Sequence, residues 1–347
     1  MNLVTGASGL LGSHIVEQLR LRGKPVRVLV RKSSDRSWLN TQGVEFAEGD
    51  VTDRASLERA CRGCDVVYHS AARVGDWGPW PEFEAITIEG TRNVVESCIA
   101  TKVRRLVHIS SVSTYGYHTK AVTVDETVPL GYKLYKWAYY SRSKIIAEQI
   151  VWDGFKTGKI EVAVIRPAWL YGPRDRTTIG RLVEMVRAGK AKILGPGHNR
   201  LNLVHAANVA EACILAADDP KANGESFNCS NDGDIKQIEF FDKLAKAAGA
   251  PPVKAHAPYR AAYFAGYVLE VLGHAFNWQK PPMITRYAVW LMGRLSYFSA
   301  DKARRVLGWR STIGYDEGIP DAVRWYDESK RGAGAKASQR ELVASGR

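Results

Sequence analysis

Three glycines near the start of the sequence have the spacing of a loop that binds phosphate. They are Gly6, Gly9 and Gly12, with a short apolar strand pattern before them and a helical pattern after them. Gly6 permits a tight turn, Gly9 lets backbone amides approach a pyrophosphate, and Gly12 lets the helix pack on the strand. The free N–H groups at the start of such a helix favour an anion. The pattern therefore predicts a dinucleotide-binding loop.

The residues after the second predicted strand bear on which dinucleotide binds. NAD-selective sites place an acid there for the ribose 2′-hydroxyl, but this chain has Val30 followed by Arg31 and Lys32. A guanidinium can hold a 2′-phosphate through two parallel hydrogen bonds. We therefore expect NADP, with NAD as the alternative cofactor and a solvated surface pair as the alternative role of the two cations. Asp50 and Val51 follow the third predicted strand, where a side chain can reach the adenine amine.

A tyrosine and a lysine four residues apart could perform proton chemistry. Tyr140 and Lys144 lie in a helical pattern, and residues i and i+4 share one face of a helix. A neighbouring ammonium favours the phenolate, so Tyr140 could give or take the proton that accompanies hydride transfer at a carbonyl. Tyr139 is the competing aromatic residue. Ser111 follows a predicted strand and could hydrogen-bond a substrate oxygen, the alternative being an ordinary turn serine.

Strand and helix patterns alternate through the first half of the chain and place these residues at one edge of a sheet. This alternation predicts an α/β fold with a doubly wound parallel sheet of the Rossmann type. The ligand should bind at the carboxyl ends of the strands. The strand patterns lie at 3–5, 26–30, 44–46, 66–68, 105–109 and 162–165, and helical patterns at 11–19, 56–64, 90–100, 143–155, 178–188 and 208–217.

The pattern changes after residue 175, which suggests two domains. We expect residues 1–175 to form an NAD(P)-binding domain, to which the segment at about 199–222 returns. Residues 176–328 should form a smaller, mostly helical substrate-binding region. The last stretch, 329–347, is polar, small and basic, and we expect a disordered tail there.

Residues 255–298 are unusually rich in aromatic side chains. These could line an apolar pocket or form the core of a helical subdomain. The run 261–276 is apolar but too short to span a bilayer. We therefore expect an apolar lid or substrate wall, with peripheral membrane contact as a further hypothesis. Basic neighbours that could meet anionic headgroups are Lys254, Arg260, Lys280, Arg286 and Arg294.

The composition fits an intracellular globular protein. The chain has 347 residues, 45% hydrophobic and 24% charged, which argues against a disordered or collagen-like chain. Five cysteines without a repeated spacing argue against a disulfide framework, so we expect a cytoplasmic location. The lone Cys61-x-x-Cys64 pair predicts no metal. The net charge of +13 favours an anionic partner, but no basic motif interleaved with aromatic residues predicts nucleic-acid binding.

Seven motifs together resemble the extended short-chain dehydrogenase/reductases, the superfamily of NAD(P)-dependent epimerases and dehydratases. They are TGASGLLG (5–12), GDVTD (49–53), DVVYHSAA (65–72), EGTRNV (89–94), RLVHISSVSTYG (105–116), YYSRSK (139–144) and IRPAWLYGPRD (165–175). The resemblance implies that Ser111, Tyr140 and Lys144 are catalytic. One departure is Thr87, which stands where the family usually has an asparagine that helps to order the active-site helix. The implied cofactor contacts are Gly6, Ser8, Gly9, Leu10, Leu11, Gly12, Ala71, Ala72, Tyr140, Lys144, Pro167 and Ala168.

Two further segments resemble the branch of 3β-hydroxysteroid dehydrogenases and 2-alkyl-3-oxoalkanoate reductases. They are GDWGPW (75–80) and ITRYAVWLMGRLSYFSADKARRVLGW (284–309). The resemblance implies an NAD(P)-dependent oxidoreductase that interconverts a secondary alcohol and a ketone on a bulky apolar substrate. It also implies a homodimer, because helices at 90–100 and 143–155 commonly form the dimer interface in this family.

Two other functions remain open at this point: a nucleotide-sugar epimerase or dehydratase, and a non-catalytic dinucleotide-sensing protein. A dehydratase usually has an acid close to the Ser111 position, whereas Asp125 and Glu126 come later, in a loop. A sensor has no need of an intact Ser111, Tyr140 and Lys144 set.

Overall fold

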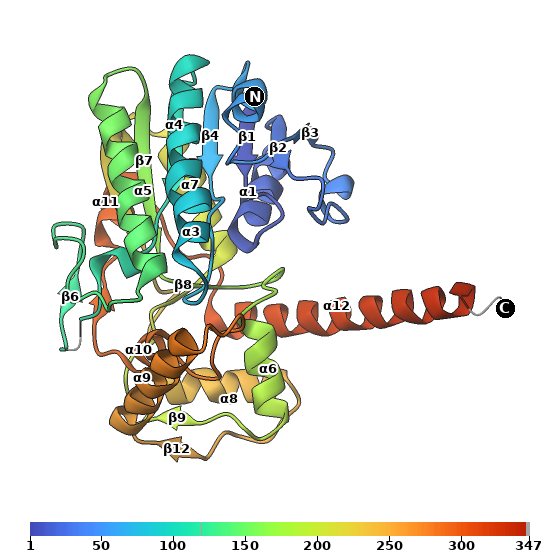
Figure 1. The fold of residues 1–347 in the computed structure, drawn as a ribbon, viewed down its shortest axis with the longest axis vertical. Coiled ribbons are helices and arrows are strands. Elements are labelled where there is room, and N and C mark those ends of the chain that lie inside the picture. Colours follow the sequence, from blue (N-terminus) through green and yellow to red (C-terminus); the bar gives the residue numbers. More distant parts are fainter. Residues whose placement is uncertain (119, 345–347) are drawn as a thin grey trace.

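Seven parallel strands form the centre of the molecule (Figure 1). The computed structural model describes residues 1–118 and 120–344. The strand order of the main sheet is β11-β7-β5-β4-β1-β2-β3, and every neighbouring pair is parallel. The predicted doubly wound α/β fold is therefore confirmed. The strands are β1 (Asn2–Thr5), β2 (Val26–Val30), β3 (Glu45–Glu48), β4 (Val66–His69), β5 (Arg105–Ile109), β7 (Glu161–Pro167) and β11 (Glu225–Cys229).

Helices cover both faces of this sheet because successive strand residues point to opposite sides. Leu3 and Leu106 pack in one core with residues of α2, α4 and α5, whereas Val4 and Val107 pack in another with residues of α1 and α7. The segment expected to return to the first domain carries α7, which packs against α1. The helices are α1 (Leu10–Leu21), α2 (Arg54–Cys61), α4 (Gly90–Ala100), α5 (Tyr139–Lys156) and α7 (Ala206–Asp218).

A second, smaller body lies below the sheet in Figure 1 and has a core of its own. Side chains from α6, α8 and the start of α12 form this core, among them Val183, Phe240 and Ile319. The short parallel pair of β8 with β10 has side chains in both cores, whereas the pair of β6 with β13 packs in the core of the sheet region. The remaining elements are α3 (Trp80–Phe83), β6 (Thr123–Val124), β8 (Trp169–Tyr171), α6 (Ile179–Arg187), β9 (Ile193–Leu194), β10 (Leu203–His205), α8 (Gln237–Ala247), β12 (His256–Ala257), α9 (Tyr259–Ala275), α10 (Arg286–Gly293), β13 (Tyr297–Phe298), α11 (Asp301–Leu307) and α12 (Tyr315–Ala344).

Three features differ from the sequence pattern. Strand β11 adds a seventh member to the predicted six. Helix α5 begins at Tyr139 rather than at Ser143, so Tyr140 lies in its first turn. Where a disordered tail was expected over 329–347, the structure instead continues α12 as far as Ala344. Four alanines and four lysine or arginine residues between 329 and 344 favour helix. Residues 345–347 lie outside the described residues.

The long α12 projects away from both bodies in Figure 1. Within the part of the chain that the structure describes, neither α12 nor any other helix has the length and hydropathy to cross a bilayer.

Candidate active site

The glycine loop between β1 and α1 leaves no room for side chains at two positions. Gly6 has a φ of +69°, which favours glycine. A Cβ on Gly12 would lie 2.2 Å from the carbonyl oxygen of Gly6, and a Cβ on Gly6 would lie 2.8 Å from the amide of Ala71. Gly9 is the N-cap of α1, and it has no side chain that could cap the helix. The first N–H groups of α1 are therefore placed to receive an anion.

The other residues of this loop divide between its surface and the core. Ser8 and Leu10 are half-buried, whereas Leu11 is buried among the core residues of α1. Leu11 can therefore contact a ligand in the loop through its backbone but not through its side chain. This geometry fits a dinucleotide pyrophosphate, which is bound by amides.

The cations after β2 are exposed at the edge of the sheet beside this loop. Val30 is buried, and Arg31 and Lys32 are both exposed. Lys32 lies 3.8 Å from Glu48, which also pairs with Arg36 at 3.2 Å. Among the residues that the structure describes, the guanidinium of Arg31 has no hydrogen-bond or ion-pair partner, and only its backbone is bonded. Arg31 is therefore available to an anionic ligand.

The remaining predicted cofactor contacts end strands at the same edge. Asp50 accepts two hydrogen bonds of 2.9 Å from Thr52, which fix its carboxylate. Val51 is buried. Ala71 and Ala72 follow β4 and are half-buried.

Pro167 ends β7, and Ala168 follows it. Both residues are buried, and the amide of Ala168 donates to Cys229 of β11 at 2.9 Å. These strand ends therefore share the carboxyl edge of the sheet, as the topology required.

Tyr140 and Lys144 lie one turn apart on α5, and the structure brings Ser111 to the tyrosine. Burial raises the pKa of Tyr140, and a hydrogen bond with the Ser111 side chain opposes this rise. Lys144 donates from Nζ to the carbonyl oxygen of Ile109 at 2.7 Å and is only 3% exposed. Burial lowers the pKa of Lys144 to about 8, and the charge of Glu148 opposes this. A neutral phenol and a buried ammonium are thus held at the end of β5.

A buried ion pair supports these groups, and sequence reasoning missed it. Glu148 of α5 accepts a 2.6 Å hydrogen bond from Ser110, the neighbour of the predicted serine, and is paired with both ends of the Arg166 guanidinium. Arg166 of β7 also donates to the hydroxyl of Tyr115 at 2.7 Å. The spacing held one clue, since Glu148 follows Lys144 by one helical turn.

Thr87 has a structural role where the family resemblance implied an asparagine. It lies in a π-helical segment at Glu84–Glu89, a local form that is frequent at functional sites. Its hydroxyl accepts from the amide of Arg73 at 3.0 Å, and its carbonyl accepts from Thr91 at 2.6 Å. Thr91 is in turn 3.0 Å from His69. Thr87 therefore holds the chain that follows Ala71 and Ala72.

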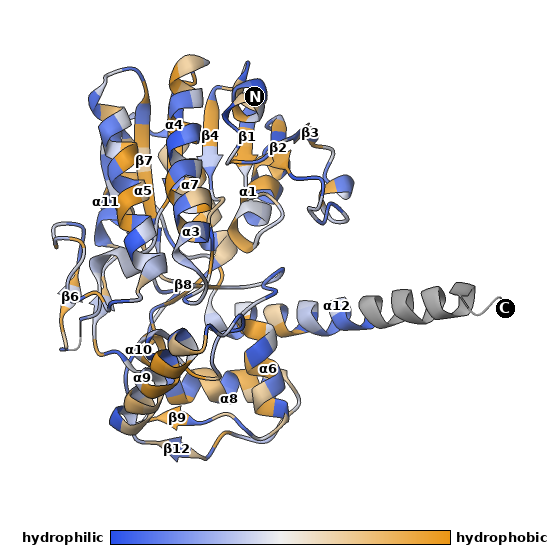
Figure 2. Ribbon diagram, in the orientation of Figure 1, coloured by the Kyte–Doolittle hydropathy of each residue, from blue (hydrophilic) through white to orange (hydrophobic). Residues whose placement is uncertain are grey.

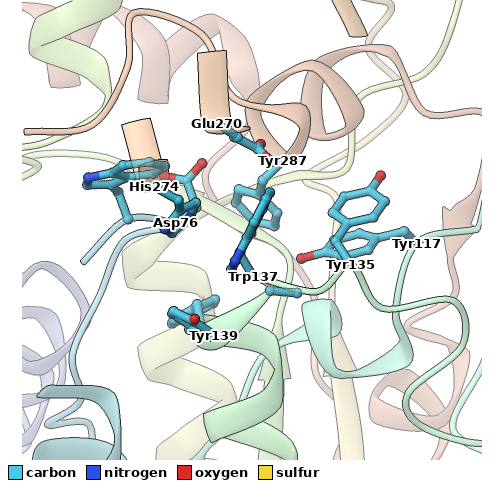
Figure 3. Close-up of a pocket in the computed structure, with 11 residues that line it drawn as sticks. Asp76, Tyr117, Tyr135, Trp137, Tyr139, Glu270, His274 and Tyr287 are labelled. Carbon is cyan, nitrogen blue, oxygen red and sulfur yellow. The ribbon is translucent and has the colours of Figure 1, made fainter. Parts of the chain in front are cut away.

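A small cavity lies beside Tyr140 and is walled mainly by aromatic rings (Figure 3). The rings come from separate segments, including Trp77 before α3, Tyr117 and Tyr135 after β5, and Tyr287 of α10. The cavity volume is about 20 Å³, room for about one water molecule. A bulky substrate can therefore enter only if this wall moves.

Three neighbouring rings line one side of the cavity. His274 of α9 lies 4.4 Å from Trp77 and 4.3 Å from Trp137, measured between ring centroids. Trp77 also donates from its indole to the carbonyl of Trp278 at 3.0 Å, and Thr285 hydrogen-bonds Asp76. This ring clasp (Trp77, His274, Trp137) brings the 75–80 loop against the C-terminal segment, so the two motifs that suggested one family branch meet at one site.

The competing tyrosine and the expected surface cations are also placed by the structure. The ring of Tyr139 lies 5.5 Å from that of Trp80 and lines the same cavity. Lys254, Arg260 and Lys280 are exposed, as expected for groups that could meet headgroups.

The expectation of surface exposure is wrong for two of the five cations, because protein groups cover them. Arg286 is 9% exposed and pairs with Glu270, and Arg294 is 2% exposed and lies over the ring of Trp290.

Comparisons with known proteins bear on the whole chain. Residues 2–230 match the model of the NAD dependent epimerase/dehydratase family. The 2-alkyl-3-oxoalkanoate reductase of Stenotrophomonas maltophilia is 31% identical, covering 91% of this chain and 96% of its own. The decarboxylating sterol-4-alpha-carboxylate 3-dehydrogenase of Mus musculus is 30% identical, covering 94% of this chain and 91% of its own. The crystal structure of gox2253 is 30% identical with a TM-score of 0.79, covering 95% of this chain and 99% of its own.

Proposed function

Because the chain belongs to the NAD dependent epimerase/dehydratase family, we propose that it is an NAD(P)-dependent oxidoreductase that interconverts a secondary alcohol and a ketone on a bulky apolar substrate. One observation carries this proposal. Tyr140, whose pKa the Ser111 side chain lowers against the effect of burial, lines a cavity whose wall is mainly aromatic. Such a wall favours the binding of an apolar substrate, because the apolar surface of that substrate is removed from water.

The site residues have complementary roles in this reaction. When bound, the dinucleotide supplies or accepts the hydride. In reduction, Tyr140 donates its proton to the carbonyl oxygen, since its raised pKa keeps the phenol protonated at neutral pH. Ser111 hydrogen-bonds the same oxygen, and the ammonium of Lys144 stabilises the phenolate that remains. In oxidation, Tyr140 takes the proton back.

The proton role of Tyr140 is tested by Tyr140→Phe, with Tyr139→Phe as the matched control. We expect Tyr140→Phe to lower turnover by about 10²–10⁴-fold and to leave the Kd for the dinucleotide within a few-fold, because the glycine loop contributes most of the binding. Turnover retained by Tyr140→Phe but lost by Tyr139→Phe would assign the acid to Tyr139.

The substrate class follows from the relatives' names. One relative is named for an oxoalkanoate and the other for a sterol carboxylate, so both substrates carry a carboxylate near the reacting carbon. We propose a 3-oxo or 3-hydroxy acid with a bulky apolar body. A panel of a 2-alkyl-3-oxoalkanoate, a 3β-hydroxysteroid and a UDP-sugar, assayed with NADPH and NADH, tests this. Turnover of the UDP-sugar alone would replace the proposal with an epimerase.

A dehydratase is less well supported by the neighbourhood of Ser111. Glu126 accepts from the amide of Asn228 at 2.7 Å, and Asp125 accepts from Thr127 at 2.6 Å. Glu126 is thus engaged by β11, and Asp125 by its own loop.

The preferred dinucleotide is proposed to be NADP. The glycine cradle fits the pyrophosphate, and the exposed guanidinium of Arg31 beside buried Val30 suits a 2′-phosphate. The Kd for NADPH should be below that for NADH, and Arg31→Asp should invert the order. The control is Arg62→Asp, an exposed arginine after α2, which should leave the ratio unchanged. Equal native affinities would contradict the preference.

Helix α9 is proposed to contact a membrane surface, in a protein that is otherwise cytoplasmic. Figure 2 shows apolar colour along α9, and Phe264 and Phe276 are 65% and 71% exposed. Exposed apolar side chains beside Arg260 and Lys280 suit an anionic interface. Vesicles containing phosphatidylglycerol should float the protein at low salt and less at high salt. Phe264→Ser should weaken flotation, whereas Leu21→Ser, at a residue 81% exposed on α1, should not.

A homodimer through α4 and α5 is also proposed. The two helices pack side by side on one face of the sheet (Figure 1), and Ile146 of α5 is 40% exposed there. Light scattering should give twice the chain mass of 38.4 kDa. Ile146→Glu should yield the monomer while Ile146→Val keeps the dimer, and a native monomer would contradict the proposal.

A further inference from the structure

Arg294 is a buried cation that the catalytic residues do not explain. It follows α10, is 2% exposed, and all three of its guanidinium nitrogens lack a hydrogen-bond partner among the residues that the structure describes. A guanidinium carries five N–H donors, and burying an ion without a partner is costly. This arrangement points to a ligand that supplies the missing acceptors.

The surroundings of Arg294 hold the guanidinium in place without satisfying its hydrogen bonds. The guanidinium carbon (Cζ) of Arg294 lies 4.5 Å from the ring centroid of Trp290 and 4.8 Å from that of Phe298. Stacking on rings leaves the in-plane N–H donors free. The amide of Arg294 donates to Trp290 at 2.9 Å, so the backbone that carries the side chain is fixed as well.

A second unpaired polar group lies on the same side of the chain. Arg294 has extended backbone angles, and in extended chain residues i and i+2 point the same way. Accordingly, Leu295 between them is 57% exposed, while Ser296 is 2% exposed and its hydroxyl also has no partner among the described residues. Arg294 and Ser296 together form a buried pair of hydrogen-bond donors, which we name the donor pair.

The donor pair lies directly behind the wall of the catalytic cavity. The ring of Trp290 is 4.9 Å from that of Tyr117 and 6.0 Å from that of Tyr287, and both tyrosines line the cavity. The charge of Arg294 also acts on Tyr287, where it opposes the rise in pKa that burial causes. One layer of rings therefore separates the guanidinium from the space beside Tyr140.

We infer that Arg294 and Ser296 bind the carboxylate of the substrate at the inner end of this cavity and so select acids over neutral ketones. The inference rests on the proposed oxidoreductase function. Since the cavity holds about 20 Å³, the ring of Tyr287 turns aside as the substrate enters and lets the carboxylate reach the guanidinium. Glu270, which lines the same cavity, is paired with Arg286 at 2.6 Å and is thus neutralised. Asp76 hydrogen-bonds Thr285.

The test compares an acid with its methyl ester, which has the same carbon skeleton without the charge. The substrates are 2-alkyl-3-hydroxyalkanoate and its methyl ester, assayed by oxidation with NADP and NAD. The native protein should have a kcat/KM for the acid roughly 10- to 100-fold above that for the ester, the range expected for charged hydrogen bonds. Arg294→Met should remove this ratio by lowering the value for the acid alone.

Matched variants separate charge recognition from folding. Arg200→Met replaces an exposed arginine that lies over Tyr297 and pairs with Asp234, and the acid-to-ester ratio should not change. Arg294→Lys keeps the charge and should retain part of the ratio. Binding gives a second measurement, since decanoate should raise the Tm of the native protein but not that of Arg294→Met.

The outcomes distinguish a failure of carboxylate binding by Arg294 from a failure of the proposed oxidoreductase function. Equal native kcat/KM values for acid and ester would overturn the inference while leaving the oxidoreductase intact. Equal losses on acid and ester in Arg294→Met would assign the residue a structural role instead. No turnover of any alcohol or ketone in the panel would sink the proposed function itself.

Discussion

Replacing Lys144 with methionine should stabilise the protein at neutral pH while disabling it. Burial lowers the pKa of Lys144 from an ordinary 10.5 to about 8. A difference of about 2.5 pKa units corresponds to about 3.5 kcal/mol, at about 1.4 kcal/mol per unit. The folded protein bears this cost at pH 7, where the lysine is charged both folded and unfolded. Methionine removes it.

The gain is reduced by one lost hydrogen bond. Lys144 donates to Ile109 at 2.7 Å, and a buried carbonyl left unpaired costs about 1–3 kcal/mol. The net effect of Lys144→Met at pH 7 is then a rise of about 0.5–2.5 kcal/mol in the free energy of unfolding. Turnover should fall by about 10²-fold or more, because the phenolate of Tyr140 loses its ammonium.

The pH dependence provides the sharper measurement. Between about pH 8 and 10.5 the unfolded chain binds a proton at Lys144 that the folded chain does not, so the contribution of this residue to stability rises with pH. At pH 10 the native lysine is largely neutral when folded, and Lys144→Met should become destabilising through the lost hydrogen bond.

Urea unfolding followed by tryptophan fluorescence at pH 7 and pH 10 measures the change in sign. Lys156→Met, at an exposed position on the same helix, serves as the control and should show no such change. An effect of Lys144→Met that is destabilising at pH 7, or equal at both pH values, would refute the reasoning.

Three further predictions concern dinucleotide binding, stability and substrate entry. Gly12→Ala should abolish dinucleotide binding and lower the Tm, because its Cβ would lie 2.2 Å from the Gly6 oxygen; isothermal titration that gives native affinity would contradict this. Glu148→Gln should cost about 3–5 kcal/mol in urea unfolding, since it leaves buried Arg166 without its anion, whereas a loss under 1 kcal/mol would mean that water replaces the pair. His274→Ala should open the ring clasp and lower KM for the bulkiest substrates, and an unchanged KM across a series of chain lengths would show that the clasp does not limit entry.

The nucleotide half of the site could be predicted from local sequence. A glycine loop works through backbone amides and the absence of Cβ atoms, and both are properties of neighbouring residues. The Tyr140 and Lys144 pair is likewise local, because one helical turn fixes their spacing. The alternation of strands and helices then placed these motifs at one edge of the sheet, and the structure confirms that topology.

The substrate half could not be predicted in the same way. His274 and Trp77 are distant in sequence and meet only because α9 packs against the 75–80 loop. Glu148 and Arg166 form an ion pair between a helix and a strand, and no pattern along either element specifies it. Aromatic composition alone could not decide which rings line a cavity and which fill the core.

The sequence by itself determined the fold class and the position of the dinucleotide loop, because backbone geometry and hydrophobic periodicity act over a few residues. Only the tertiary structure decided that Arg294 is buried. Its sequence neighbours suggested a surface cation, but Trp290 and Phe298 enclose it. Whether a charge is solvated depends on which distant rings fold over it, and that desolvation turns one arginine among many into a candidate for binding an anion.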